Sequence, residues 1–344
     1  MIGIGTAKKL AALGMAIMCL YLMFMGQVRD TAIEAGRMKN VDVVTPAPTE
    51  QAALETEGAE ETETEPAPAP MAVSLPEESY EPLPQPGETQ SLHQIQETTI
   101  TGGLTIKNET SYSVDIAGML AEGSQVTLAS GEPQILIIHT HSSEAYTPAG
   151  LDRYEASDTN RTEDTEFNIV RVGDELTELF QQAGLNVIHD REIYDYPSYT
   201  GSYERSGAAV RDYLAQYPSI SVVIDMHRDA LGANGVVYKT MAEETGVCAS
   251  QVMMLVGSDE SGLEHPNWRS NLSLALYLQE AVSTAHPTLM RPVALVPQRY
   301  NQHLTGGSLI LEVGSNGNTL QEALAAIRLF ADAAAPALLE LVRE

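Results

Sequence analysis

Histidine and glutamate side chains occur where several apolar, β-branched runs of this sequence end. The run QILIIHT leads into His139 and His141, with Glu144 close behind in HSSE, whereas ISVVIDMH ends at His227 and LILE at Glu312. Two neutral imidazoles and a carboxylate are a common ligand set of catalytic zinc, which keeps a fourth position for water. We therefore expect a Zn²⁺ site of His141, Glu144 and His227. Glu312 is then placed to take a proton from water and return it to a leaving amine.

Other polar residues near these positions are candidates for supporting roles or substrate binding. His139 lies two residues before His141, so it either replaces that ligand or supports the ligands from behind. In HPNWRSN, an indole for stacking and a guanidinium for binding a carboxylate are candidates for lining a groove, and packing within a loop is the alternative. The supporting or substrate-binding candidates are His139, Arg228, Asp229, Trp268, Arg269 and His303.

Several other functions lack the residues that they require. The sequence contains no G-x-S-x-G, P-loop or G-x-G-x-x-G motif, and Cys248 lies in an apolar run that indicates packing. A glycosidase pair of Glu144 and Glu312 would leave the histidines without a role. With 19 Lys+Arg against 47 Asp+Glu and a net charge of −28, the chain is not expected to bind nucleic acid. Its two cysteines exclude a disulfide framework.

Strands and helices alternate in the part of the chain that carries these residues, residues 133–344. This alternation predicts an α/β fold, with a mostly parallel twisted sheet flanked by helices. Ligands of such sheets bind beyond the carboxyl ends of the strands, where the histidines and glutamates lie. We expect strands at 134–140, 185–190, 220–227, 247–257, near 293 and at 307–314, and helices at 168–183, 203–217, 271–285 and 319–343.

The first residues of the chain have the composition of a membrane anchor. Residues 10–25 are uninterrupted apolar, and Lys8 and Lys9 precede them. A helix of this run is roughly 24 Å long, and flanking residues extend it toward the ~30 Å hydrocarbon core. We expect a cytoplasmic tail at 1–9 and a transmembrane helix at 10–28, with the rest of the chain outside. A cleaved signal peptide is the alternative, although no small-residue cleavage site follows the run directly.

Two segments separate the predicted anchor from the α/β domain. Residues 40–94 are rich in Pro, Glu and Thr and contain no Lys or Arg, so we expect a disordered acidic linker. The linker serves either as a spacer or as a neutral connection. Residues 95–132 alternate apolar with polar residues and contain glycine pairs, which predicts a small β-rich preamble packed on the main domain.

The sequence resembles the stage II sporulation protein P family in IIHTHSSEAY, FNIVRVGDEL, VVIDMHRDA, HPNWRSNLSLA and YNQHLTGGSLILEVGSNGNTLQEA. These motifs follow one another over residues 135–326. The family is similar to zinc-dependent N-acetylmuramoyl-L-alanine amidases, which implies an amidase-like fold. The resemblance places a first zinc-binding His at His141, a second at His227 and the catalytic Glu at Glu312. The third ligand is Glu144, or else Glu163 or Glu166, since the wider amidases place a Glu at the start of the next helix.

The resemblance also implies a substrate, partners and a location. The implied substrate is peptidoglycan, cleaved between the MurNAc lactyl group and L-Ala, and the family is also credited with endopeptidase activity on cross-links. The implied partners are stage II sporulation proteins D and M, at the sporulation septum during engulfment. The domain would then lie on the extracytoplasmic side of the cell membrane, held by a single-pass helix. Two other classes stay open: a non-catalytic, membrane-anchored scaffold that binds the wall, and a zinc carboxypeptidase.

Overall fold

The structure is a computed structural model, and it describes residues 94–102, 104–149, 160–233, 236–244 and 246–344. Of the two units into which the chain divides, every described residue belongs to the second, Gly87–Glu344. The predicted tail, anchor and linker lie outside the described residues, except for the last linker residue, Gln94. Within the described residues, the structure contains no helix with the length and apolar character needed to cross a membrane.

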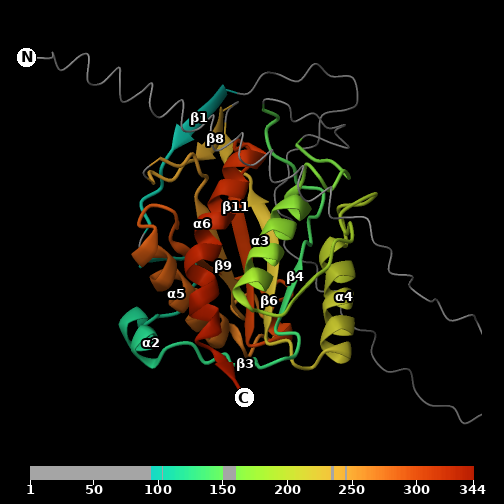
Figure 1. Cartoon of the computed structure of the whole chain (residues 1–344), viewed down its shortest axis with the longest axis vertical. Coiled ribbons are helices and arrows are strands. Elements are labelled where there is room, and N and C mark those ends of the chain that lie inside the picture. Colours follow the sequence, from blue (N-terminus) through green and yellow to red (C-terminus); the bar gives the residue numbers. More distant parts are fainter. Residues whose placement is uncertain (1–93, 103, 150–159, 234–235, 245) are drawn as a thin grey trace, which may run out of the picture. The chain divides into compact units, whose positions relative to one another are not determined.

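A seven-stranded sheet forms the centre of the second unit (Figure 1). Every neighbouring pair in it is parallel except β9 and β11, so the predicted α/β sheet is confirmed, and it is mixed rather than wholly parallel. In order across the sheet, the strands are β2 (Ile106–Asn108), β10 (Val293–Val296), β9 (Val252–Gly257), β11 (Gly307–Ser315), β6 (Val222–Asp229), β4 (Ile135–Ile138) and β5 (Val187–His189).

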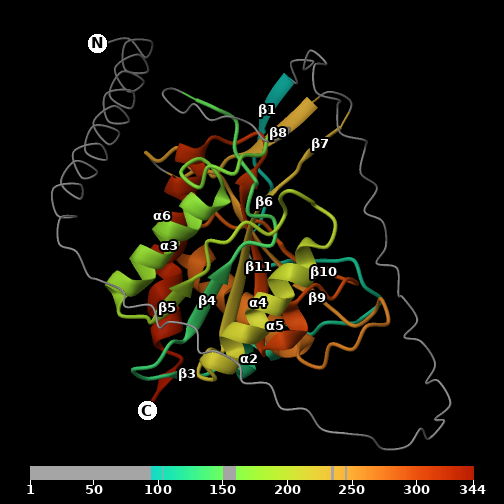
Figure 2. The same ribbon diagram turned by 90° about the vertical axis from the view of Figure 1, so that its right-hand side faces the viewer.

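Helices cover both faces of this sheet (Figure 2). On one face lie α3 (Ile169–Ala183), α5 (Trp268–Ala285) and α6 (Leu320–Leu339), and on the other lies α4 (Ser202–Gln216). Local signals set their ends. The Asn168 side chain accepts a hydrogen bond from the first turn of α3, and a left-handed Gly184 ends that helix. Thr319 and Glu322 form a capping box at the start of α6.

The core follows from strands that are buried on both faces. The residues of β4 are all buried, and β6 and β11 are buried over most of their length, as expected for central strands that read as continuous apolar runs. Beneath α3, α5 and α6 lies one large apolar cluster. A smaller cluster, which includes Leu136, Val223 and Val210, lies beneath α4.

Shorter elements complete the unit. Strands β1 (Gln94–Thr98), β8 (Val236–Thr240) and β7 (Gly232–Ala233) form a three-stranded sheet, and β3 (Leu128–Ala129) pairs with β12 (Val342–Arg343). Helix α2 (Ile116–Glu122) follows β2, and the 3-10 helix η1 (Gln302–Leu304) follows β10. The sequence patterns did not predict β7 and β8. They also extended the last helix through Arg343, whereas α6 ends at Leu339.

The strand directions determine which residues can meet. Strands β4, β6 and β11 run the same way, so their carboxyl ends share one edge of the sheet. Because β9 is antiparallel to β11, the carboxyl ends of β9 and β10 lie at the opposite edge. The residues after β4, β6 and β11 therefore lie together at one edge of the sheet. The residues after β9 and β10 lie at the opposite edge.

Candidate metal centre

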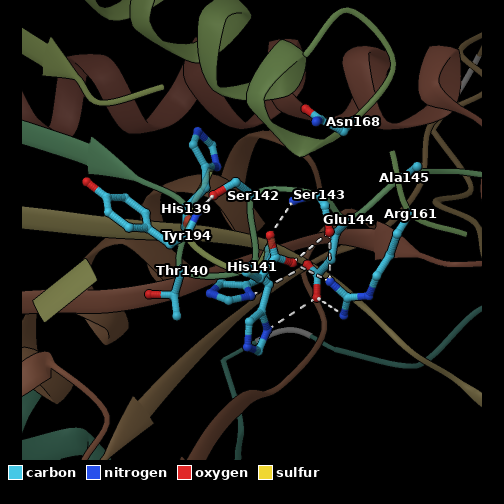
Figure 3. A network of polar contacts seen from close by, with 12 residues as sticks. His139, Thr140, His141, Ser142, Ser143, Glu144, Ala145, Arg161, Asn168 and Tyr194 are labelled. Atoms are coloured by element: carbon cyan, nitrogen blue, oxygen red, sulfur yellow. Dashed lines mark hydrogen bonds and ion pairs between the residues drawn. The ribbon is translucent and has the colours of Figure 1, made fainter. Parts of the chain in front are cut away.

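Two histidines and one glutamate converge at the carboxyl ends of β4 and β6. Within the described part of the chain, His141, Glu144 and His227 form the group suited to holding a metal ion, with one donor atom from each lying within 4.8 Å of the others. The Nδ1 atoms of His141 and His227 lie 3.4 and 3.5 Å from the carboxylate of Glu144. Figure 3 shows the His141 and Glu144 side chains pointing toward each other. All three residues are buried, so the group is largely shielded from solvent.

The carboxylate of Glu144 is held by the backbone and side chains around it. The backbone N–H of Arg228 donates to Oε2 at 3.0 Å, and Nη2 of Arg161 lies 3.6 Å from Oε1. Burial by itself would raise the pKa of Glu144. Hydrogen bonds with His141 and His227, together with the charges of His227 and Arg228, hold that pKa well below its usual value. Glu144 is therefore an anion at this position.

Asp225 holds the second histidine from behind. Its Oδ1 lies 3.0 Å from Nε2 of His227, and its carboxylate accepts hydrogen bonds from the Thr140 backbone and hydroxyl at 2.7 and 2.6 Å. Burial opposes a charge on His227, but Asp225 and Glu144 outweigh it and raise the pKa of His227 well above its ordinary value. The structure thus draws a positive charge to this point, between two carboxylates.

This donor set fits a zinc ion. Two imidazoles and a carboxylate match a common catalytic zinc triad, and a carboxylate behind a ligating histidine is a frequent companion of such ligands. The Nδ1 atoms of His141 and His227 both face the carboxylate of Glu144, and the ring centroids lie 4.9 Å apart at 86°. A divalent cation bound here would replace the proton on His227 as the positive charge.

An aromatic wall adjoins His141. The ring of Tyr199 stacks on His141 with centroids 4.5 Å apart, and Tyr203 meets it edge-on at 5.4 Å. The guanidinium of Arg161 lies over the Tyr199 ring at 5.1 Å and is also paired with Asp195. Arg161 therefore connects the Tyr199 ring to the carboxylate of Glu144.

Glu312 stands beside the metal-binding group on the adjacent strand. It is the register partner of His227 in the β11–β6 pair. Burial, and then the nearby charge of Asp229, raise the pKa of Glu312 to about 8, and its Oε2 has no hydrogen-bond partner among the described residues. Asp229 is itself held by Arg291 at 2.8 Å. A carboxyl group with a pKa near neutrality can both accept and donate a proton.

The structure separates the other sequence candidates from the centre or gives them structural contacts. Arg228 donates side-chain hydrogen bonds to the carbonyl oxygens of Ala145 and Asn160. His139 bonds to Met226 and His189 rather than joining the ligands, because the chain leaves β4 at Ile138 and no longer alternates as a strand. Glu163 and Glu166 are exposed and do not belong to the group.

Trp268, Arg269 and His303 are not brought to the metal centre. Trp268 is buried and stacks on Tyr112 at 5.0 Å, with Arg269 over its ring at 4.3 Å. His303 lies in η1, with its ring 6.5 Å from that of His265. These residues follow β9 and β10, whose carboxyl ends lie at the opposite edge of the sheet. Packing, rather than a groove beside the metal centre, accounts for the contacts of Trp268.

Sequence reasoning missed several residues that surround the centre. Asp225 carried a usable signal, since it lies two residues before His227 and strand alternation places both on the same side. Arg161, Asp195 and Tyr199 carried none, because long connections bring them to the site. A long-range contact of this kind leaves no local pattern.

Comparison with known proteins identifies a family. A family model described as stage II sporulation protein P matches residues 34–335. A curated protein named stage II sporulation protein P, from Bacillus subtilis (strain 168), is 27% identical over 209 residues, which cover 58% of this chain and 49% of the relative. The chain thus spans about half the length of the curated relative that it matches.

Solved structures with similar folds are more distant. N-acetylmuramoyl-L-alanine amidase AmiC2 of Nostoc punctiforme is 13% identical with a TM-score of 0.36, covering 61% of this chain and 97% of that one. The CwlD amidase from Clostridioides difficile, solved in complex with the GerS lipoprotein, is 13% identical with a TM-score of 0.34, covering 60% and 98%. At these values the likeness says nothing about the activity of this chain.

Proposed function

Because this chain belongs to the stage II sporulation protein P family, we propose that it is a zinc-dependent peptidoglycan hydrolase. The proposed reaction is that of an N-acetylmuramoyl-L-alanine amidase, which hydrolyses the amide between the MurNAc lactyl group and L-Ala. One observation carries the proposal: buried His141, Glu144 and His227 donors lie within 4.8 Å of one another. Next to them stands Glu312, with a pKa raised to about 8.

His141, Glu144 and His227 would hold the zinc ion. When bound, zinc supplies a Lewis acid that polarises a carbonyl and makes water more acidic. The surroundings support this assignment. Asp225 contacts the far nitrogen of His227, and the backbone of Arg228 orients Glu144. These contacts fix the direction in which each ligand presents its donor atom.

Glu312 would move the proton in this reaction. Its carboxylate accepts a proton from the attacking water, whose oxygen forms a bond to the lactyl carbonyl carbon. The C–N bond then breaks, and Glu312 returns the proton to the amine of L-Ala. A pKa of about 8 suits both halves of this cycle near neutral pH. The same residues would serve endopeptidase cleavage of cross-links, since that reaction also hydrolyses an amide.

The family and the sequence support a proposal for the location and the partners. We propose that residues 10–28 anchor the protein in the cell membrane and that the hydrolase unit lies on the extracytoplasmic side, at the sporulation septum. Stage II sporulation proteins D and M are the proposed partners. The proposed substrate is the peptidoglycan of the cell wall.

Product analysis tests the reaction. The full chain in detergent is incubated with purified peptidoglycan, with and without a chelator, and the released products are identified by mass spectrometry. We expect intact stem peptides with a free L-Ala amino group, which disappear with the chelator and return with zinc. Release of single amino acids would indicate a carboxypeptidase instead. Absence of products, including with proteins D and M added, would indicate a scaffold.

A pair of variants tests the proton carrier. Glu312→Gln keeps the shape of the side chain and removes its proton transfer, so turnover should fall by about 10²–10⁴-fold while zinc stays bound. Glu163→Gln makes the same chemical change at an exposed site and should act like the wild type. Full turnover of Glu312→Gln with zinc bound would make the assignment of Glu312 wrong.

A further inference from the structure

His139 links the two chain segments that carry the histidines of the metal centre. Its ring is completely buried, and both ring nitrogens have partners. Nδ1 lies 3.1 Å from the carbonyl oxygen of Met226, and Nε2 lies 2.8 Å from Nε2 of His189. His139 comes two residues before His141, and Met226 comes directly before His227. In Figure 3, the His139 ring points away from His141.

The contacts of this ring determine where its proton lies. The Met226 carbonyl can only accept a hydrogen bond, so Nδ1 of His139 carries the proton and Nε2 must accept. Nε2 of His189 is therefore the donor to His139. On its other side, Nδ1 of His189 lies 3.2 Å from Asp174, and a carboxylate also can only accept. His189 thus lies between His139 and Asp174, with one ring nitrogen facing each of them.

Charged groups lie beside His189. Asp174 reaches it from α3, and Arg191, from the segment after β5, lies 3.0 Å from the same Asp174 oxygen. The side chain of His189 is only 6% exposed. Asp174 therefore holds His189 on one side, and His139 lies at its other ring nitrogen.

Helix α3 packs closely against the two rings. Gly173 faces the pair, and a Cβ at that position would lie 2.6 Å from Nε2 of His139 and 2.7 Å from Nε2 of His189. Real Cβ contacts essentially never occur at such distances. The two rings are thus held between the end of β4 and the backbone of α3, which fits them only because residue 173 has no side chain.

We propose that His139 is a positioning residue, which ties the segment of His141 to the strand of His227 through the Met226 carbonyl. His189, held by Asp174, donates to Nε2 of His139 and so keeps His139 in the required tautomer. This inference rests on the proposed metal centre, because what His139 fixes is the separation of the two imidazoles that would bind zinc. His189 and Asp174 thereby support the metal centre indirectly, through their contacts with His139 and with each other.

Two substitutions separate the contacts of His139. In His139→Asn, the amide nitrogen takes the place of Nδ1, so the bond to Met226 is kept and the bond to His189 is lost. In His139→Gln, the amide group takes the place of Nε2, so the bond to His189 is kept and the tie to Met226 is lost. The measured quantity is the zinc dissociation constant of the full chain, from competition with a chelator.

The two variants should differ in zinc affinity. We expect His139→Gln to bind zinc about 10–100-fold more weakly, as for other residues that support metal ligands, and His139→Asn to stay close to the wild type. Gly173→Ala should also weaken zinc binding, because it displaces the ring pair without removing either ring. Equal weakening by Asn and Gln, or undiminished affinity of His139→Gln or Gly173→Ala, would overturn the positioning role.

A metal-independent readout tests the proton assignment. Nitrogen-15 NMR of the zinc-free wild type should show His139 protonated at Nδ1 alone. A proton on Nε2 of His139 instead would overturn this assignment. Failure of the proposed function looks different, since the wild type itself would then bind no zinc at His141, Glu144 and His227.

Discussion

The buried carboxyl group of Glu312 should make the stability of the zinc-free protein depend on pH. Folding raises its pKa from 4.5 to about 8, chiefly through burial and then through the charge of Asp229. Between these two pH values the folded state keeps a proton that the unfolded chain has lost. The contribution of Glu312 is therefore fully present below pH 4.5 and is lost as the pH rises through about 8. The glutamine side chain of Glu312→Gln does not ionise, so its contribution to the free energy of unfolding stays constant over this pH range.

The size of the effect follows from the shift. At 1.36 kcal/mol for each pKa unit, a rise from 4.5 to about 8 corresponds to about 5 kcal/mol as an upper bound. The free energy of unfolding of Glu312→Gln, relative to the wild type, should therefore increase by up to about 5 kcal/mol between pH 4.5 and 8 and stay constant above that. Urea unfolding at several pH values, followed by circular dichroism with a chelator present, measures the difference.

A second carboxyl group provides a control of opposite sign. Burial would raise the pKa of Glu175, but ion pairs with Arg328 and Arg171 lower it below 4.5. Its contribution is present above the unfolded pKa and is lost as the pH falls, so Glu175→Gln should destabilise the protein at neutral pH and less in acid. If Glu312→Gln and the wild type changed in parallel from pH 5 to 9, Glu312 would ionise like an exposed carboxyl, and the reasoning would be refuted.

Three further predictions concern the metal centre, a distant histidine and a turn. Asp225→Asn removes the charge that lies 3.0 Å behind His227, so zinc should bind about 10–100-fold more weakly in chelator competition; unchanged affinity would contradict the role of Asp225. Burial lowers the pKa of His265 to about 4, so its contribution to stability is present above its ordinary pKa of 6.5 and is lost as the pH falls through about 4. The melting temperature of His265→Gln should therefore fall less than that of the wild type between pH 7 and 4, and equal slopes would count against a buried neutral His265. Gly314→Ala should destabilise the protein by more than the order of 1–2 kcal/mol that a left-handed backbone costs, because its φ is +69° and an added Cβ would lie 2.9 Å from a side-chain oxygen. Gly184→Ala, at φ +103° in the left-handed region with nothing within 4 Å of the added Cβ, should show the backbone cost alone in the same urea measurement. Equal losses of unfolding free energy in the two variants would contradict a steric contribution at Gly314.

Much of the architecture could be predicted because it is encoded locally. The apolar runs of β4, β6, β10 and β11 and the helical periodicity of α3 to α6 lie where the sequence patterns placed them. The reversal of β9 could not be predicted, since an apolar strand has the same pattern in either direction. The hairpin of β7 and β8 was missed because its stabilising contacts, such as those of Thr240 with Asn318, join residues far apart in the sequence.

The candidate site was predictable where strand ends supply the residues. His141, Glu144 and His227 do converge, because parallel strands bring their carboxyl ends to one edge. His139 shows the limit of this reasoning. Two-residue spacing indicates the same side only while the chain stays extended, and β4 ends before His139. Its ring instead enters the layer beneath α3, where Gly173 and His189 receive it.

The reversed direction of β9 also has a practical consequence for studying this protein. The loops that follow β9 and β10 lie at the edge of the seven-stranded sheet opposite to the carboxyl ends of β4, β6 and β11. A fluorophore or affinity label attached there, for example at the exposed Ser261, can report on binding without crowding the candidate metal centre. The same edge suits immobilisation on a sensor surface, since it leaves the opposite edge turned toward the solution.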